Sequence, residues 1–153
     1  MMKNIALLFV LGFLLACNTG IEKDKNTAVR PIAENHAEHA QKASALSLNN
    51  GAKWKADSNT LVNIALLQDI ASNAKKENLE NYLQTANFLQ EGLNKMVSEC
   101  KMKGANHEAL HIWLEPLMEL INDFNNATTL EIAEICLDEI RNQINLFSQY
   151  FEE

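Results

Sequence analysis

Glycine and proline are scarce in this chain, which has five glycines and two prolines among 153 residues. No stretch alternates apolar and polar residues between clusters of turn-forming residues, as a half-buried strand would. The composition therefore argues against a fold built from many short strands, such as a β-sandwich or a barrel.

Basic residues are also few relative to acidic ones. The chain has 13 Lys and Arg against 20 Asp and Glu, a formal net charge of −7. Nucleic acids and anionic membrane surfaces attract proteins through an excess of positive charge. The balance therefore predicts no nucleic-acid partner, and it makes the whole chain a poor candidate for binding an anionic membrane surface.

Cysteine is the third scarce residue, and the first of the three cysteines carries the most information. Lys3 is the basic residue near the start of the chain, an apolar run covers Ile5 to Ala16, and Cys17 follows. The run is too short to span a bilayer as a mature helix and is typical of a secretory signal. The ending Leu14-Leu15-Ala16-Cys17 resembles the lipobox of bacterial lipoproteins, although a cleaved signal with a chance cysteine is the alternative.

The lipobox resemblance implies cleavage before Cys17 and lipidation of that residue with palmitate-type acyl chains. The domain would then lie outside the cytoplasm, in the cell envelope or periplasm, held most readily to the outer membrane. The chain is then expected to consist of three regions: a signal peptide over 1–16, a lipidated Cys17 with a flexible tether over 17–48, and a folded domain over 49–153. As a random coil the tether would span on the order of 30 Å.

The folded domain shows apolar residues at helical spacing in four segments. The first follows a cap at Asp57 or Ser58, and the second follows Asn78 and ends at Gly104. Asn106 is the expected cap of the third, and Thr128 with Glu131 makes a capping-box spacing for the fourth. Four helices joined by short connections predict an all-α fold, an up-down-up-down four-helix bundle.

This topology predicts that Cys100 and Cys136 do not form a disulfide. Cys100 ends the second helix near one pole, while Cys136 lies about two turns from the other pole. At about 1.5 Å per residue the two are roughly 20 Å apart, whereas a disulfide needs Cα atoms within about 7 Å.

A candidate metal site lies where the second helix meets the third. Cys100 is on the apolar stripe of one helix, His107 and His111 stack one turn apart on the other, and Met102 lies between. A thiolate, a thioether and two imidazoles suit copper, and zinc is possible through the cysteine and histidines. The alternative is that both histidines are core-edge residues hydrogen-bonded to their neighbours and Cys100 is a small buried hydrophobe. The protein would then be a metal-free envelope interaction module.

His107 to His111 also matches H-E-x-x-H, the zinc helix of metallopeptidases, in which Glu108 would activate water. Glu134 would be the third ligand. The bundle places Glu134 near the opposite pole, and the chain has no strand to hold a peptide. We therefore expect a non-enzymatic protein.

The span from Leu48 to Glu153 resembles a group of poorly characterised small helical lipoproteins of the Bacteroidetes type. The resemblance is carried by the Leu48–Trp54 opening, the C-x-M-x-G-x-x-H-x-x-L-H segment over 100–111 and the following Trp113-Leu114-Glu115-Pro116-Leu117. It implies location and fold, with no established reaction.

Overall fold

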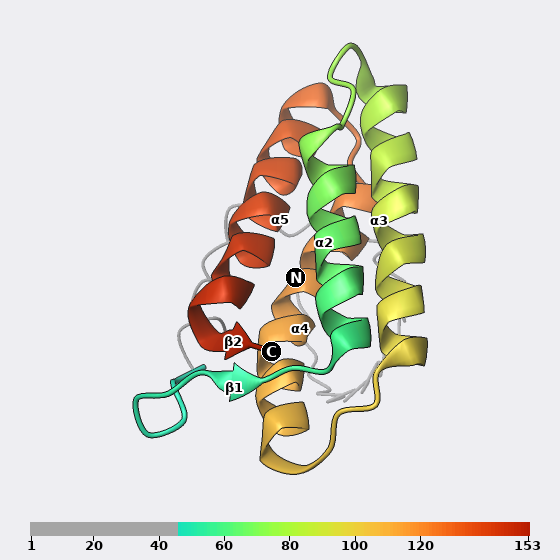
Figure 1. Cartoon of the computed structure of the whole chain (residues 1–153). Helices are drawn as coiled ribbons and strands as arrows, with labels where there is room; N and C mark the ends of the chain where they lie inside the picture. The colour runs from blue at the N-terminus through green and yellow to red at the C-terminus, as the bar shows by residue number, and fades with distance from the viewer. Residues whose placement is uncertain (1–45) are drawn as a thin grey trace, which may run out of the picture.

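The computed structural model describes residues 46–153, which form a bundle of four antiparallel helices (Figure 1). The helices are α2 (Ser58–Ser72), α3 (Leu79–Glu99), α4 (Gly104–Asn125) and α5 (Leu130–Tyr150). Each packs against the next along the chain, and α2 also packs against α5. The expected all-α, up-down-up-down bundle is confirmed.

Two helix starts follow the sequence prediction. Asp57 caps α2 by accepting a hydrogen bond from the Thr60 N–H, and Asn78 caps α3 by accepting one from the Asn81 N–H. These side chains satisfy backbone donors that the first helical turn leaves without partners.

The other two starts differ from the prediction. Helix α5 is capped by Thr129, whose hydroxyl accepts from the Ile132 N–H, one residue after the expected cap Thr128. Helix α4 begins at Gly104, so this glycine does not end α3. Asn106 lies inside α4, where its Oδ1 accepts from the Lys55 N–H instead of capping the helix.

A small parallel sheet closes one end of the bundle, and the sequence pattern did not predict it. Strand β1 (Trp54–Lys55) pairs with β2 (Phe151–Glu152). The strands are two residues long, too short for any alternation to be read. We call this end, which also holds the α3–α4 connection, the proximal pole, and the end with the α2–α3 and α4–α5 connections the distal pole.

The core lies along the bundle axis and is almost entirely apolar. Its largest fully buried side chains come from all four helices: Trp113, Tyr82, Phe124, Leu67, Leu89, Leu93, Met96, Leu117, Ile121, Leu137, Ile140 and Ile144. Leu46, in the segment expected to be a tether, is also buried in this core. Residues 1–45, with the expected signal peptide, most of the tether and Cys17, lie outside the described residues.

Both cysteines of the described chain are free thiols. Cys100 follows α3 at the proximal pole, and Cys136 lies in the second turn of α5, which starts at the distal pole. The structure thus separates the two cysteines as the bundle topology predicts.

Candidate metal site between α3 and α4

Three of the four predicted ligands line one small pocket between the proximal end of α3 and the start of α4. Cys100 caps α3, while His107 and His111 lie in the first two turns of α4. The two imidazole rings have centroids 4.5 Å apart and planes inclined at 60°. The pocket is lined by Met96, Val97, Cys100, His107, Leu110, His111 and Leu114.

The pocket is apolar apart from the thiol and the two imidazoles. Its volume is about 30 Å³, comparable with the share of one water molecule in the liquid. Such a space suits a single ion or water and is far smaller than the sites that bind organic cofactors. Val97 on its rim is 52% exposed, so the pocket opens at the surface.

Within residues 46–153, no other residue forms a hydrogen bond or an ion pair with the Cys100 thiol or with the imidazoles of His107 and His111. The imidazoles of His107 and His111 contact each other, and within this range neither forms a hydrogen bond or an ion pair with another residue. The Cys100 thiol likewise has no hydrogen-bond partner in the same span. This differs from core-edge histidines that are hydrogen-bonded to their neighbours.

Met102 does not join the other three residues. It is 9% exposed, and its Sδ accepts a hydrogen bond of 3.6 Å from the Thr60 hydroxyl on α2. The thioether is therefore held on the α2 side of the α3–α4 connection. Among residues 46–153, as their side chains lie in the structure, no three His, Cys, Asp or Glu side chains form a group that could hold a metal ion.

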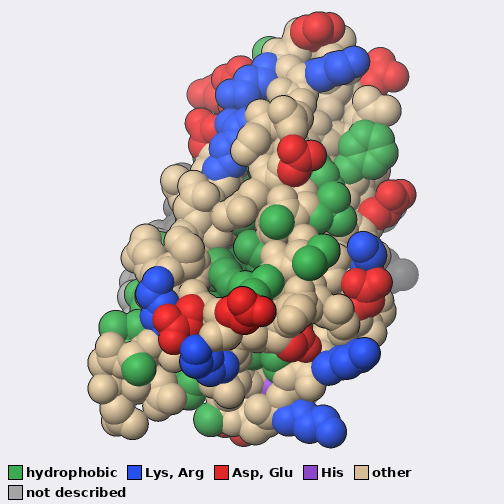
Figure 2. All heavy atoms as spheres, viewed as in Figure 1, with side chains coloured by type: hydrophobic (Ala, Val, Ile, Leu, Met, Phe, Trp, Pro, Cys, Tyr) green, Lys and Arg blue, Asp and Glu red, His purple; other side chains and the backbone are tan. Residues whose placement is uncertain are grey.

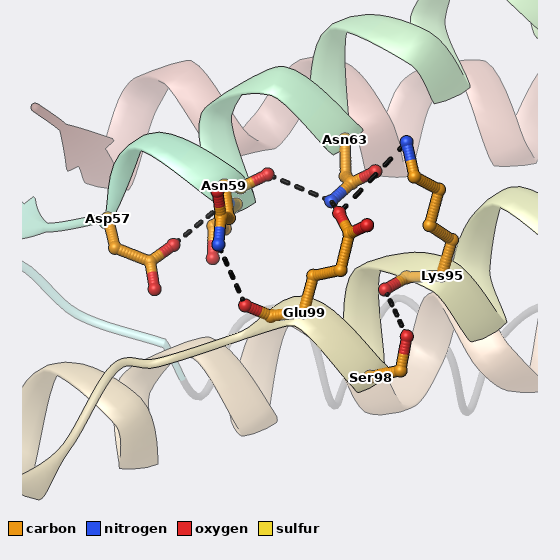
Figure 3. Close-up of polar contacts among 7 residues, drawn as sticks. Asp57, Asn59, Asn63, Lys95, Ser98 and Glu99 are labelled. Atoms are coloured by element: carbon orange, nitrogen blue, oxygen red, sulfur yellow. Dashed lines mark hydrogen bonds and ion pairs between the residues drawn. The ribbon is translucent and has the colours of Figure 1, made fainter.

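Polar contacts from the start of α2 reach Glu99 at the end of α3 (Figure 3) and Lys101 in the α3–α4 connection. Asp57 uses one carboxylate oxygen for the Thr60 N–H and the other for the Lys101 N–H, both at 2.7 Å. Asn59 donates to the Glu99 carbonyl, and Asn63 donates to the Glu99 carboxylate. The sequence indicated Asp57 as a cap, but its bond to a residue 44 positions away had no local signal.

These contacts lower the pKa of Asp57. Burial by itself raises the pKa of the carboxyl, but hydrogen bonds from Thr60 and Lys101, together with the Lys101 charge, bring it below 3.8. The carboxylate is thus ionised at neutral pH, when it holds the N-terminus of α2 and the α3–α4 connection together.

Glu134 lies away from the H-E-x-x-H histidines, as the topology predicts. Its carboxylate accepts a hydrogen bond of 3.3 Å from the Tyr82 hydroxyl. Both residues lie in the first turns of α5 and α3, at the distal pole. Burial, followed by the Glu134 charge and hydrogen bond, raises the pKa of Tyr82. Glu134 therefore cannot be a third ligand to a metal held by His107 and His111 without a large rearrangement.

Cys136 is a buried thiol unrelated to the pocket. Burial, followed by the nearby charges of Asp123 and Glu139, raises its pKa to about 11. Because the thiolate is the form that ligates metals, this cysteine is unsuited to that role at neutral pH.

No family model, no curated protein and no solved structure matches this chain.

In the described part of the chain, no helix combines the length and hydropathy needed to cross a membrane.

Proposed function

We propose that this chain is a lipid-anchored protein of the cell envelope that binds one soft transition-metal ion, copper or zinc, between α3 and α4. Cys100, His107 and His111 would be the ligands, and Cys17 would carry the lipid. The observation that carries the metal proposal is the gathering of one thiol and two imidazoles, none engaged by another described residue, around a pocket of about 30 Å³.

The chemistry of these donors supports a soft metal. A thiolate with two imidazoles suits copper(I) or zinc, and a three-ligand set leaves a position open for a partner or solvent. Loading would require the side chains to rotate toward a common point. The partial exposure of all three residues allows this rotation without repacking the core. Met102, bonded to Thr60, is not part of the proposed ligand set.

A site at the surface of a rigid bundle favours reversible binding. No general acid or base and no substrate-sized cavity accompanies the three donors in the described pocket. The role would therefore be sequestration, sensing or transfer of the metal without catalysis. The resemblance to small envelope lipoproteins and the lipobox ending at Cys17 support this location.

Metal titration of the purified, reduced full-length chain tests the proposal. We expect near-stoichiometric binding of copper(I) or zinc, lost in a Cys100→Ser/His107→Ala double variant and strongly weakened by His111→Ala. Cys136→Ser and Met102→Leu are matched controls that remove a sulfur outside the pocket, and both should bind like the parent. Binding that is weak and unchanged in the double variant would refute the proposal.

A metal-free interaction module is the second candidate, and a different surface favours it. Val62 is 64% exposed and Phe88 48% exposed. A groove of about 330 Å³ between α2 and α3 is lined by Leu66, Ile70, Phe88, Glu91, Gly92 and Lys95. Hydrophobic side chains are visible over this face (Figure 2). This candidate predicts no change in thermal stability with copper or zinc, whereas the metal proposal predicts a rise.

A zinc peptidase using Glu108 has least support, because Glu134 lies at the distal pole. It would be recognised by peptide hydrolysis that Glu108→Gln abolishes.

A further inference from the structure

Helix α2 distributes its polar and apolar side chains differently from the other three helices. It buries the polar Thr60 and Asn63 completely, both at 0% exposure, while Val62 on its outer side is 64% exposed. Asp69 is the one charged residue among the 15 of α2, whereas α3, α4 and α5 each carry four or five. A helix that is apolar around its whole circumference is typical of one covered on both sides. The outer side of α2 therefore has the character of a contact surface.

The exposed apolar side chains of α2 continue onto α3, which lies beside it (Figure 1). Leu66 is 36% exposed and Phe88 is 48% exposed, and both line the groove of about 330 Å³ between the two helices. Contiguous exposed apolar patches on a soluble domain mark interaction sites. We call the following residues together the α2–α3 face: Val62, Leu66, Ile70, Phe88, Glu91, Gly92 and Lys95.

The α2–α3 side of the bundle also carries the fewest charges. Helices α4 and α5, on the opposite side, hold eight acidic residues against Arg141. Helices α2 and α3 hold four acidic residues, Asp69, Glu80, Glu91 and Glu99, with Lys95. Two copies of an acidic chain repel each other, and the repulsion is smallest where the charge density is lowest. A second copy would therefore approach most easily through the α2–α3 face.

Two charged residues on the rim of the groove are arranged so that a second copy can pair with them. Glu91 and Lys95 are both exposed and lie four residues apart on α3. Within residues 46–153, Glu91 forms no ion pair, and Lys95 makes a 4.0 Å contact with Glu99. A two-fold axis that crosses α3 between Glu91 and Lys95 sets the helix antiparallel on its copy. Each glutamate then lies opposite the lysine of the other copy, so the rim is self-complementary.

The same axis brings the apolar residues of the two copies together. Gly92 lies between the two charged residues, and a Cβ added to it would lie 2.9 Å from the Leu67 side chain of α2. The neighbouring Leu66 is therefore level with the axis and would meet Leu66 of the second copy. Phe88, one turn along α3, would reach toward the groove of the second copy. The arrangement covers the apolar side chains that α2 leaves in water.

The size of the face indicates a weak association. A 15-residue helix is about 22 Å long and two adjacent helices are about 20 Å wide, which gives roughly 450 Å² in projection. A standard interface buries about 800 Å² on each partner. The dimer should therefore form and dissociate with changes in protein concentration.

We propose that the α2–α3 face binds a second copy of this chain in an antiparallel two-fold dimer, packed through Leu66 and Phe88 and aligned by Glu91 and Lys95. Segment 18–45 of the same chain is a poorer occupant of the groove, because its large apolar residues are only Ile21, Val29 and Ile32. The pocket with Cys100 lies between α3 and α4, away from this face. The inference therefore does not depend on metal binding.

Sedimentation velocity of the full-length Cys17→Ser chain, which cannot carry the proposed lipid, tests the dimer over about a hundredfold range of protein concentration. We expect a shift from monomer to dimer as the concentration rises. Phe88→Gln should weaken self-association roughly tenfold or more. Met118→Gln is the matched control, because Met118 on α4 is also 48% exposed, and it should associate like the parent. Circular dichroism confirms that both variants fold.

Charge reversal tests the two-fold pairing independently of Phe88. Glu91→Lys and Lys95→Glu each set like charges opposite one another, and each alone should weaken self-association by roughly tenfold. An equimolar mixture of these two variants should recover the dimer, and so should the double variant Glu91→Lys/Lys95→Glu, because both restore opposite charges across the axis. A parent chain that stays monomeric over the whole range would overturn the proposal. Single variants that associate like the parent, or a mixture that does not recover the dimer, would also overturn it.

Discussion

The α4–α5 and α3–α4 interfaces both contain polar side chains, but they use them in opposite ways. Between α4 and α5, the buried Trp113 indole donates to the Gln143 carbonyl at 3.0 Å, and the Gln143 amide donates back to the Trp113 carbonyl at 2.7 Å. Between α3 and α4, the Cys100 thiol and the His107 and His111 rings line a pocket without a protein partner in the described chain.

The comparison separates polar groups that hold the fold from polar groups that are available to a ligand. A buried group must be paired, because an unsatisfied donor or acceptor costs about 1–3 kcal/mol. Partly exposed groups escape this cost because water can reach them. The imidazoles can therefore remain unpaired by protein at little expense, and the interface that contains them is the better place for binding.

The largest effect should come from breaking the paired interface. Trp113→Ala removes a side chain that is 1% exposed and stacks edge-on against Phe147 at 5.1 Å. We expect a loss of about 3–5 kcal/mol in the free energy of unfolding. His111→Ala in the metal-free protein should cost less than about 0.5 kcal/mol. Urea unfolding measures both, and equal losses would make His111 a structural residue.

A smaller effect is expected where α2 supports the unpaired interface. Asp57→Ala removes the cap of α2 and the bond to the Lys101 N–H, and we expect a loss of about 1–2 kcal/mol at neutral pH. The folded-state pKa of Asp57 lies below its usual 3.8. Its contribution is therefore complete above that pH and disappears as pH falls through the folded-state value.

Urea unfolding of Asp57→Ala and parent across this acid range checks the sign. The two stabilities should converge as the parent carboxyl becomes protonated. A difference that stays constant with pH would show that the ionised form of Asp57 is not the source of the stability.

Gly104, the residue at which α4 begins, allows a third comparison, between two substitutions at one backbone position. Gly104 has φ of +61° with no heavy atom near the position of a Cβ. Gly104→Ala should therefore cost about 1–2 kcal/mol through backbone strain alone. Gly104→Asn is the matched control, because asparagine tolerates this conformation better, and it should cost less. Equal thermal unfolding of the two variants would contradict this explanation.

The smallest perturbation uses the two thiols as probes of the two environments. In a Cys17→Ser chain, we expect iodoacetamide to modify Cys100 readily and Cys136 only on unfolding. The reason is that burial raises the pKa of Cys136 to about 11 and blocks access to it. Cys100→Ser should abolish fast labelling, and Cys136→Ser should leave it unchanged. Fast modification of Cys136 in the folded chain would contradict its burial.

Most of the bundle was predictable from the sequence because its signals are local. Apolar residues at helical spacing indicated all four helices, and Asp57 and Asn78 cap residues only three positions away. Where two local signals competed, the prediction failed by one to a few residues. Thr128 and Thr129 are both acceptable caps, and Gly104 followed by Asn106 left the start of α4 ambiguous.

The candidate site was predicted in part for the same reason. His107 and His111 share a helix face by spacing alone, and the bundle topology brings Cys100 to them. The position of Met102 depends on the Thr60 hydroxyl of another helix, a contact across 42 positions of sequence. A side chain in a loop has no periodicity to fix its direction. The sequence therefore could not show whether the Met102 sulfur points toward α2 or toward the pocket between α3 and α4.

The sequence by itself determined the four helices, their antiparallel order and the separation of Cys100 from Cys136, because periodicity and short connections allow few other arrangements. Only the tertiary structure decided which side chains meet around the α3–α4 connection. It paired β1 with β2, turned Asn106 toward Lys55, and placed Met102 against Thr60. These contacts join residues distant in sequence, and their energies depend on the packing of the whole bundle.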